Sequence, residues 1–101
     1  MTEPLVLPGH GGTITVAPAA LERLVVRAAE SVKGARVRRP KRSVEIAHGG
    51  GRATVSLELA VGHDVPVPKL ARAVQAQVAE AVASTSGLEI ESVEITVAEI
   101  A

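Results

Sequence analysis

The chain of 101 residues contains no cysteine and no Phe, Trp or Tyr. The absence of cysteine excludes disulfide bonds, thiolate metal sites and a cysteine nucleophile. Without aromatic rings the chain has no platform on which single-stranded bases could stack, which disfavours an RNA-recognition sheet or an OB-fold. Long hydrophobic runs are also missing, since a stretch such as Leu24-Val25-Val26 is far shorter than the roughly 20 residues of a membrane-spanning helix.

The residues that are present suit one small globular domain, with 47% hydrophobic and 22% charged side chains. Its core must be built from Val, Leu, Ile and Ala. The first residues carry Glu3 and two prolines and lack the basic start and apolar stretch of a secretory signal, so we expect a cytoplasmic protein. Residues 1–12 are rich in Pro and Gly and predict a flexible lead-in, followed by a single domain over 13–101.

Eleven basic and eleven acidic residues cancel, but the bases gather in the first half of the chain and the acids in the second. The densest cluster, residues 33–42, is called the basic segment here. Four interpretations of it stay open: a solvated loop, a contact with anionic lipid headgroups, a contact with nucleic-acid phosphates, or a contact with the acidic half of a second copy. The cations of the basic segment are Lys33, Arg36, Arg38, Arg39, Lys41 and Arg42.

The spacing of aliphatic residues predicts the secondary structure. Period-two alternation around three glycines predicts a hairpin, and Pro18 and Pro68 suit the first turns of two helices. Gly34 suits a left-handed helix cap, and a change of phase near Glu91 predicts a bulge in the last strand. Helices are predicted over 18–33 and 68–85, strands over 44–46, 53–61 and 90–98, and a short leading strand over 13–16.

The predicted strands carry aliphatic side chains on one face and polar side chains on the other, so only one face of the sheet needs cover. We therefore expect an α+β fold in which two helices pack on one face of a three-stranded, mainly antiparallel sheet, in the order α-β-β-α-β. An uncovered face and an uncapped edge strand are available to a partner. The candidate contact residues on the uncovered face are Thr54, Ser56, Glu58, Glu94 and Thr96.

No motif indicates catalysis or a cofactor. His48-Gly49-Gly50-Gly51 has the letters of an esterase oxyanion loop, but the chain has no Gly-x-Ser-x-Gly elbow, and the glycines suit a hairpin turn. Gly9-His10-Gly11-Gly12 matches the KH clamp without the flanking helices of that module. His10, His48 and His63 lie in three separate turns, so we expect neither a metal site nor an enzyme.

The order of several strings along the chain resembles the alkaline-shock-protein family of bacterial envelope stress response proteins. These strings are Val32-Lys33-Gly34-Ala35, Val61-Gly62, Val74-Gln75-Ala76-Gln77-Val78 and the segment from Ser86 to Val97, within a resemblance that spans about residues 12–97. Ala35, Val61 and Ser86 depart from the residues common in the family.

The resemblance implies a non-enzymatic cytoplasmic scaffold or adaptor at the inner face of the cell membrane. It further implies a membrane-anchored protein partner, contacts with related family members and self-assembly into a homo-oligomer, with no catalytic residue to carry over. Two alternatives stay open: a nucleic-acid-binding KH-like module that uses the basic segment, and a subunit of a ring-forming oligomer.

Overall fold

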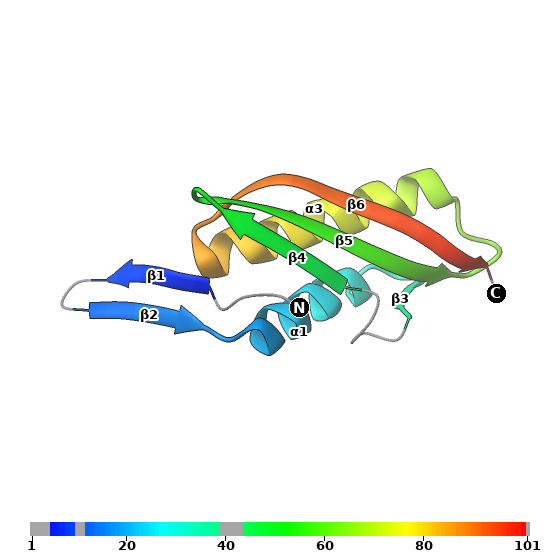
Figure 1. The fold of residues 1–101 in the computed structure, drawn as a ribbon. Coiled ribbons are helices and arrows are strands. Elements are labelled where there is room, and N and C mark those ends of the chain that lie inside the picture. The colour runs from blue at the N-terminus through cyan, green and yellow to red at the C-terminus, as the bar shows by residue number, and fades with distance from the viewer. Residues whose placement is uncertain (1–4, 10–11, 39–43, 101) are drawn as a thin grey trace.

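The structure of the protein is a computed structural model that describes residues 5–9, 12–38 and 44–100 (Figure 1). Two helices and six strands follow one another within these described residues. In order they are β1 Leu5–Gly9, β2 Gly12–Val16, α1 Pro18–Glu30, β3 Ala35–Val37, β4 Val44–Gly49, β5 Arg52–Val61, α3 Val67–Ser86 and β6 Glu89–Ile100.

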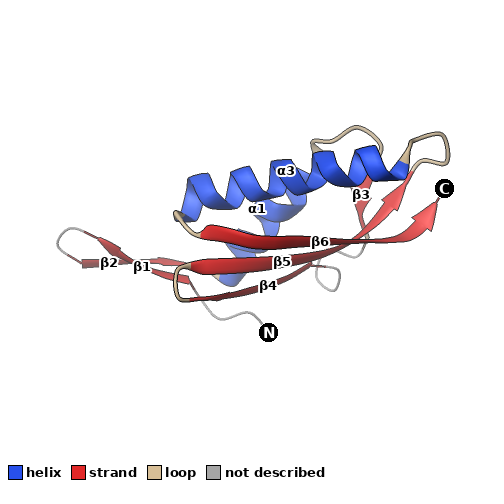
Figure 2. Ribbon diagram, turned by 90° about the horizontal axis from the view of Figure 1, so that it is seen from above, coloured by secondary structure: helices blue, strands red, loops and turns tan. Residues whose placement is uncertain are grey.

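Strand β5 lies in the middle of the main sheet. β3 and β4 both pair antiparallel with one edge of β5, and β6 pairs parallel with the other edge. Helices α1 and α3 lie side by side on one face of this sheet (Figure 2). The predicted α+β fold with two helices on one face is confirmed, with the short strand β3 added between the first helix and the hairpin.

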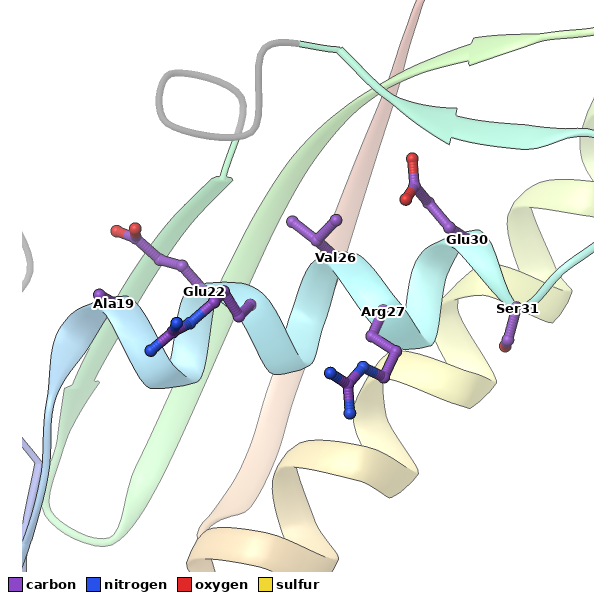
Figure 3. A pocket seen from close by; sticks show the side chains of 7 residues that line it. Ala19, Glu22, Val26, Arg27, Glu30 and Ser31 are labelled. Atoms are coloured by element: carbon purple, nitrogen blue, oxygen red, sulfur yellow. The ribbon is translucent and has the colours of Figure 1, made fainter.

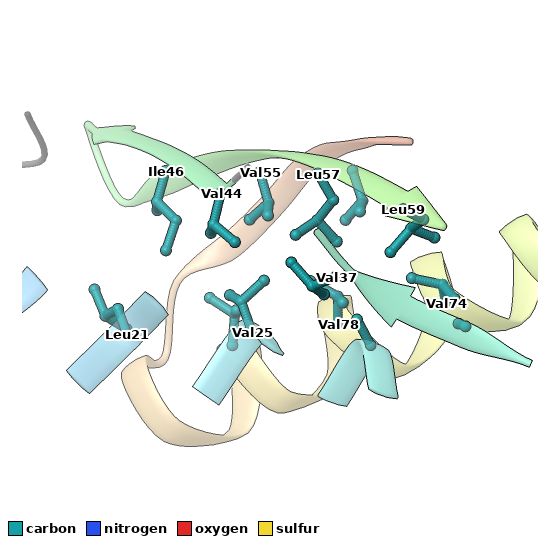
Figure 4. Packing of buried hydrophobic residues seen from close by; sticks show 14 of the residues in the cluster. Leu21, Val25, Val37, Val44, Ile46, Val55, Leu57, Leu59, Val74 and Val78 are labelled. Carbon is teal, nitrogen blue, oxygen red and sulfur yellow. The ribbon is translucent and has the colours of Figure 1, made fainter. Parts of the chain in front are cut away.

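The core fills the space between the helices and the sheet (Figure 4). From β5, alternate residues such as Val55 and Leu59 point inward and are fully buried, as are Val25 of α1 and Val78 of α3. Alternation in the strand and spacing of three or four in the helices bring these side chains to one layer. The core consists of aliphatic side chains alone because the chain has no aromatic residue.

The two helices end in different ways. α1 ends at Glu30, three residues earlier than expected, and Gly34 lies beyond it in the turn into β3, with φ of 94°. α3 ends as expected near residue 85, where Gly87 adopts the left-handed cap with φ of 73° and donates its N–H to the Ala83 carbonyl. The buried Ser86 hydroxyl donates to the Val82 carbonyl at 2.6 Å and accepts the N–H of Leu88 at 3.2 Å.

Strand β6 contains the predicted bulge. Ala53 pairs with Ile90 and Thr54 pairs with Ser92, so Glu91 is the extra residue. A second register shift, between Leu59 and Ala60, was not predicted. Because the first bulge inserts one extra residue, the Val93 side chain faces the core instead of the solvent. This is why the spacing of aliphatic residues in the sequence changes there.

The N-terminal part differs from expectation. Leu5–Gly9, within the segment over residues 1–12 that was predicted as a flexible lead-in, is a strand that pairs antiparallel with β2. The β1–β2 hairpin projects beyond the end of the main sheet (Figures 1 and 2). The leading strand predicted over 13–16 lies within β2, and β1 is its hydrogen-bonding neighbour. The residues of β1 alone show no clear periodicity from which a strand could be predicted.

Replacing Gly34 with Ala should destabilise the fold by about 1–3 kcal/mol, because its φ is positive and the added Cβ would lie 2.9 Å from Val65 Cγ2. The matched control is Gly49→Ala, whose Cβ would meet no atom within 4 Å and should change stability by less than about 0.5 kcal/mol. Urea unfolding followed by far-ultraviolet circular dichroism measures both. Equal stability of the two variants would contradict a steric requirement for glycine at position 34.

Candidate functional site

The face of the sheet opposite the helices, called the open face here, carries the five predicted sheet residues. Within the described part of the chain, no helix or strand packs against it. Thr54, Ser56 and Glu58 come from β5, and Glu94 and Thr96 come from β6. The register places Ser56 beside Glu94 and Glu58 beside Thr96, so the structure brings these residues together on one surface.

Two polar contacts on the open face connect its strands. The Ser56 hydroxyl donates to Glu94 Oε2 at 3.2 Å, joining β5 to β6. Arg38 Nε lies 3.3 Å from Glu99 Oε2, and this ion pair spans the full width of the sheet from the end of β3 to β6. With side chains 37% and 53% exposed, the ion pair is accessible to water and salt, and its contribution to stability is small.

The basic segment and the open face meet, which the sequence interpretation did not anticipate. Arg36 lies on β3 opposite Ala60, and the N–H of Arg38 donates to the Glu58 carbonyl, so both arginines extend the open face beyond the predicted residues. The signal was present in the alternation of buried Ala35 and Val37 with these arginines. A three-residue strand among many cations is too short for periodicity to reveal it.

The remaining cations of the basic segment have different positions. Lys33 is exposed in the turn between α1 and β3. Arg39, Lys41 and Arg42 lie outside the described residues. The structure therefore places three of the six cations, Lys33, Arg36 and Arg38, in and on either side of β3.

Three strands of the described sheet have one unpaired edge each, namely β3, β4 and β6. The edge of β6 is partly occupied from α3, because Gln75 Nε2 donates to the Val93 carbonyl oxygen at 2.9 Å. A side chain that takes up a main-chain acceptor in this way makes strand addition there less favourable.

A shallow hollow of about 880 Å³ lies over α1 (Figure 3). Glu22, Val26 and Glu30 follow one another at a spacing of four along the helix, and Arg27 points to another side. Glu30 is already used by the fold, because its Oε2 accepts the N–H of Val37 at 3.1 Å. The two arginines and two glutamates that line the hollow balance in charge, and the hydroxyl of Ser31, which also lines it, donates to the Ala28 carbonyl at 2.7 Å.

Metal ligands are not assembled in the described part of the chain. No group of three His, Asp or Glu side chains there could hold a metal ion. His48 lies on β4 and His63 lies in the turn after β5, at opposite ends of that strand. His10 lies outside the described residues.

Comparison with protein families decides the relationship suggested by the sequence. The model of the alkaline shock protein 23 family, described as having a cell envelope-related function, matches residues 7–101. The chain belongs to this family. The match covers the main sheet, both helices and most of the β1–β2 hairpin. None of the curated proteins matches the sequence.

Solved structures of variants of the MamM C-terminal domain share the fold of this family member. One variant has a TM-score of 0.56 at 24% identity and covers 82% of this chain and 99% of its own. A copper form has a TM-score of 0.57 at 23% identity and covers 84% of this chain and 99% of its own. A nickel form has a TM-score of 0.54 at 23% identity and covers 80% of this chain and 96% of its own. At this identity the likeness shows the fold alone.

Replacing Arg38 and Glu99 with Gln, singly and together, should give a coupling free energy of about 0.2–1 kcal/mol, as is usual for an exposed ion pair. The coupling should fall in 1 M salt, where the Debye length is only about 3 Å. Urea unfolding of the double-mutant cycle measures it. In a control cycle that pairs Arg38→Gln with Glu94→Gln, the two changes in the free energy of unfolding should add. A coupling that salt leaves unchanged would contradict the exposed geometry.

Proposed function

We propose that this member of the alkaline shock protein 23 family is a non-enzymatic scaffold or adaptor at the cytoplasmic face of the cell envelope. In this role it associates with the membrane through protein partners, including a membrane-anchored one, and assembles with further copies of itself or related chains. The observation that carries the proposal is the family match over residues 7–101, with its cell envelope-related function.

The distribution of polar groups supports a binding role. Among the residues whose burial the structure describes, Ser86 is the one buried polar residue, and its hydroxyl is used in capping α3. The other polar and charged side chains of those residues lie at least partly exposed, several of them on the open face. Enzymes gather such groups in a concave, partly buried site, whereas a flat exposed sheet face suits contact with another protein.

The route to the membrane is indirect in this proposal. No helix in the described residues is long and apolar enough to cross a membrane. The exposed Lys33 and Arg36 instead provide positive charge around β3 that attracts an acidic partner. Electrostatic attraction of this kind acts mainly on the rate of association and weakens as salt rises.

Reversing the charge of the basic segment tests this role. Changing Arg36, Arg38, Arg39, Lys41 and Arg42 together to Glu should lower recovery of the membrane-anchored partner at low salt by about tenfold or more, because attraction becomes repulsion. A tagged pull-down from gently solubilised source cells, quantified by mass spectrometry, measures the recovery. Circular dichroism verifies that the variant is folded.

The matched control reverses the exposed Arg23 and Arg27 of α1 and Arg72 of α3 to Glu, which should leave recovery close to that of the unaltered chain. Equal recovery with all three proteins would remove the basic segment from the proposal. If the unaltered chain retains nucleic acid and no membrane-anchored protein, the scaffold proposal itself is overturned and the basic segment is a phosphate-binding site.

A further inference from the structure

The β1–β2 hairpin is an aliphatic element that projects beyond the main sheet of its own copy (Figure 1). The register pairs Leu5 with Val16 and Leu7 with Ile14, and neither strand contains a charged residue. Val6 is 56% exposed. Among the described elements, β1 and β2 contact chiefly each other. Because an isolated two-stranded hairpin is only marginally stable in water, this hairpin gains stability when it packs against another surface.

The outer edge of β2 is better suited to strand pairing than the outer edge of β1. Two residues join the strands, so Gly9 and Gly12 form the closing hydrogen-bonded pair, and from there the pairs alternate between hydrogen-bonded and outward-directed main-chain groups. By this alternation Pro8 of β1 is directed outward, where it has no N–H to donate. Thr13 and Thr15 of β2 each direct an N–H and a carbonyl outward.

Of the free edges of the described main sheet, the edge of β4 has space beside it. β3 has only three residues, and Gln75 of α3 partly occupies the edge of β6. α1 packs against β3 and β4, and its Leu24 and Ala28 line a groove shared with α3, so the other flank of α1 lies along the β4 edge. That flank borders the hollow of about 880 Å³, which Val26 lines (Figure 3).

The main-chain groups along the β4 edge have the same spacing as those of β2. Gly49 and Arg52 form the closing pair of the β4–β5 hairpin, so by alternation Val44 and Ile46 direct their N–H and carbonyl groups away from β5. No other described strand pairs with this edge. Two outward-directed residues at a spacing of two on β4 therefore match the two outward-directed residues of β2.

We propose that the β1–β2 hairpin of one copy adds to the β4 edge of a second copy, with β2 parallel to β4 and covering the hollow over α1. The inference rests on the self-assembly in the proposed function and names the segments that perform it. In the register with the longest overlap, the Thr13 N–H donates to the Val44 carbonyl. The Ile46 carbonyl accepts the Thr15 N–H, and the Ile46 N–H donates to the Thr13 carbonyl.

The alternation of residue types along β2 selects the parallel direction. A parallel ladder places Thr13 and Thr15 on the open face, so Ile14 and Val16 lie on the helix-covered face with the buried Ile46 and next to the hollow. In an antiparallel ladder the threonines take those positions, and the aliphatic residues lie on the open face. Parallel addition therefore continues the covered face of the sheet with aliphatic residues.

A two-fold arrangement satisfies both copies at once. In Figure 1, β4 runs toward the end of the main sheet from which the hairpin projects, and β2 runs away from that end. When two copies meet at this end about a two-fold axis perpendicular to the strands, β2 of one copy becomes parallel to β4 of the other, and each hairpin lies on the other copy. A head-to-tail contact keeps the strand directions and would give antiparallel pairing.

The contact has the size of a stable dimer interface. Each copy contributes five residues from each hairpin strand, six from β4 and seven described residues that line the hollow. Interfaces of standard size have about 20–30 residues on each side. Charge does not oppose the contact, because the hairpin strands are uncharged and the charges that line the hollow balance. Each copy supplies both an unpartnered strand and a free edge, so two identical chains are sufficient.

Proline substitution at the two members of one register pair tests the contact. Thr15 and Val6 are paired, and they direct their N–H groups to opposite edges of the hairpin. Thr15→Pro removes a donor that the dimer uses twice, so it should raise the dissociation constant by about tenfold or more. The matched control Val6→Pro alters the edge that the dimer does not use and should leave the dissociation constant unchanged.

Sedimentation velocity with interference optics measures both dissociation constants, since the chain lacks Trp and Tyr. Equal dissociation constants for the two proline variants would overturn the assignment of β2 as the pairing strand.

A disulfide between two differently tagged chains gives a second readout without proline in the hairpin. The chain has no native cysteine, so Thr15→Cys in one chain and Ala47→Cys in the other introduce one thiol each. In the proposed register these residues lie opposite each other on neighbouring strands, about 5 Å apart, which is within the range for a disulfide. Oxidation should give covalent heterodimers. The control mixture of Thr15→Cys with Ala98→Cys, an exposed residue of β6, should give none.

Placing Thr15→Cys and Ala47→Cys in the same chain tests whether the hairpin instead folds back on its own copy. The proposal predicts covalent dimers from this double variant. Monomers with an internal disulfide, together with no heterodimer from the mixed single variants, would overturn the exchange of hairpins between copies.

The outcomes separate this inference from the proposed function. A chain that assembles without the cross-link and without sensitivity to Thr15→Pro retains the scaffold proposal but loses this interface. A chain that stays monomeric at every concentration loses both the interface and self-assembly, while recovery of a membrane-anchored protein in the pull-down still decides the adaptor role.

Discussion

The fold depends on the packing of β5, which among the described strands is the one with neighbours on both edges. Its inward residues, including Val55 and Leu59, are fully buried against α1 and α3, and they belong to the largest side chains at the centre of the core. With no aromatic ring to fill space, this core relies on close packing of branched aliphatic side chains. Both helices, the edge strands and the open face take their positions from this strand.

Because the helices cover only one face of the sheet, polar and charged side chains lie on the other face. The helices bury the aliphatic side chains of the sheet, so the alternate polar residues remain on the open face, and their charges stay exposed to water. A face of this kind has weak internal contacts, as shown by one accessible ion pair and one exposed hydrogen bond. These contacts leave the side chains of the open face exposed to water.

The similarity to the MamM C-terminal domain illustrates how little a shared fold determines. Two of the similar structures are described as copper and nickel forms, whereas the described part of this chain has no group of side chains that could hold a metal ion. At 23% identity these structures share the fold with this chain, and a shared fold does not determine side-chain chemistry. The family match, which spans both helices and the whole main sheet, is the more informative comparison for this chain.

Much of the fold was predictable because its elements have long, regular patterns. Both helices and the strand around Val55 were expected near their observed positions, and the bulge at Glu91 followed from the change of aliphatic phase. β3 was missed because three residues are too few to show a period, and α1 was expected to continue to residue 33 because Val32 keeps the helical spacing. Short elements and element ends depend on tertiary contacts, such as the bond from the Val37 N–H to Glu30.

By itself the sequence determined the α+β class, the covered and uncovered faces of the sheet and the opposite charge of the two halves of the chain, because these follow from local spacing and composition. The tertiary structure decided the parallel pairing of β6 with β5, since strand direction depends on the path of α3 across the sheet. It also decided which residues become neighbours on the open face. Arg38 and Glu99 are far apart in sequence and lie 3.3 Å apart only because β3 and β6 flank the same strand.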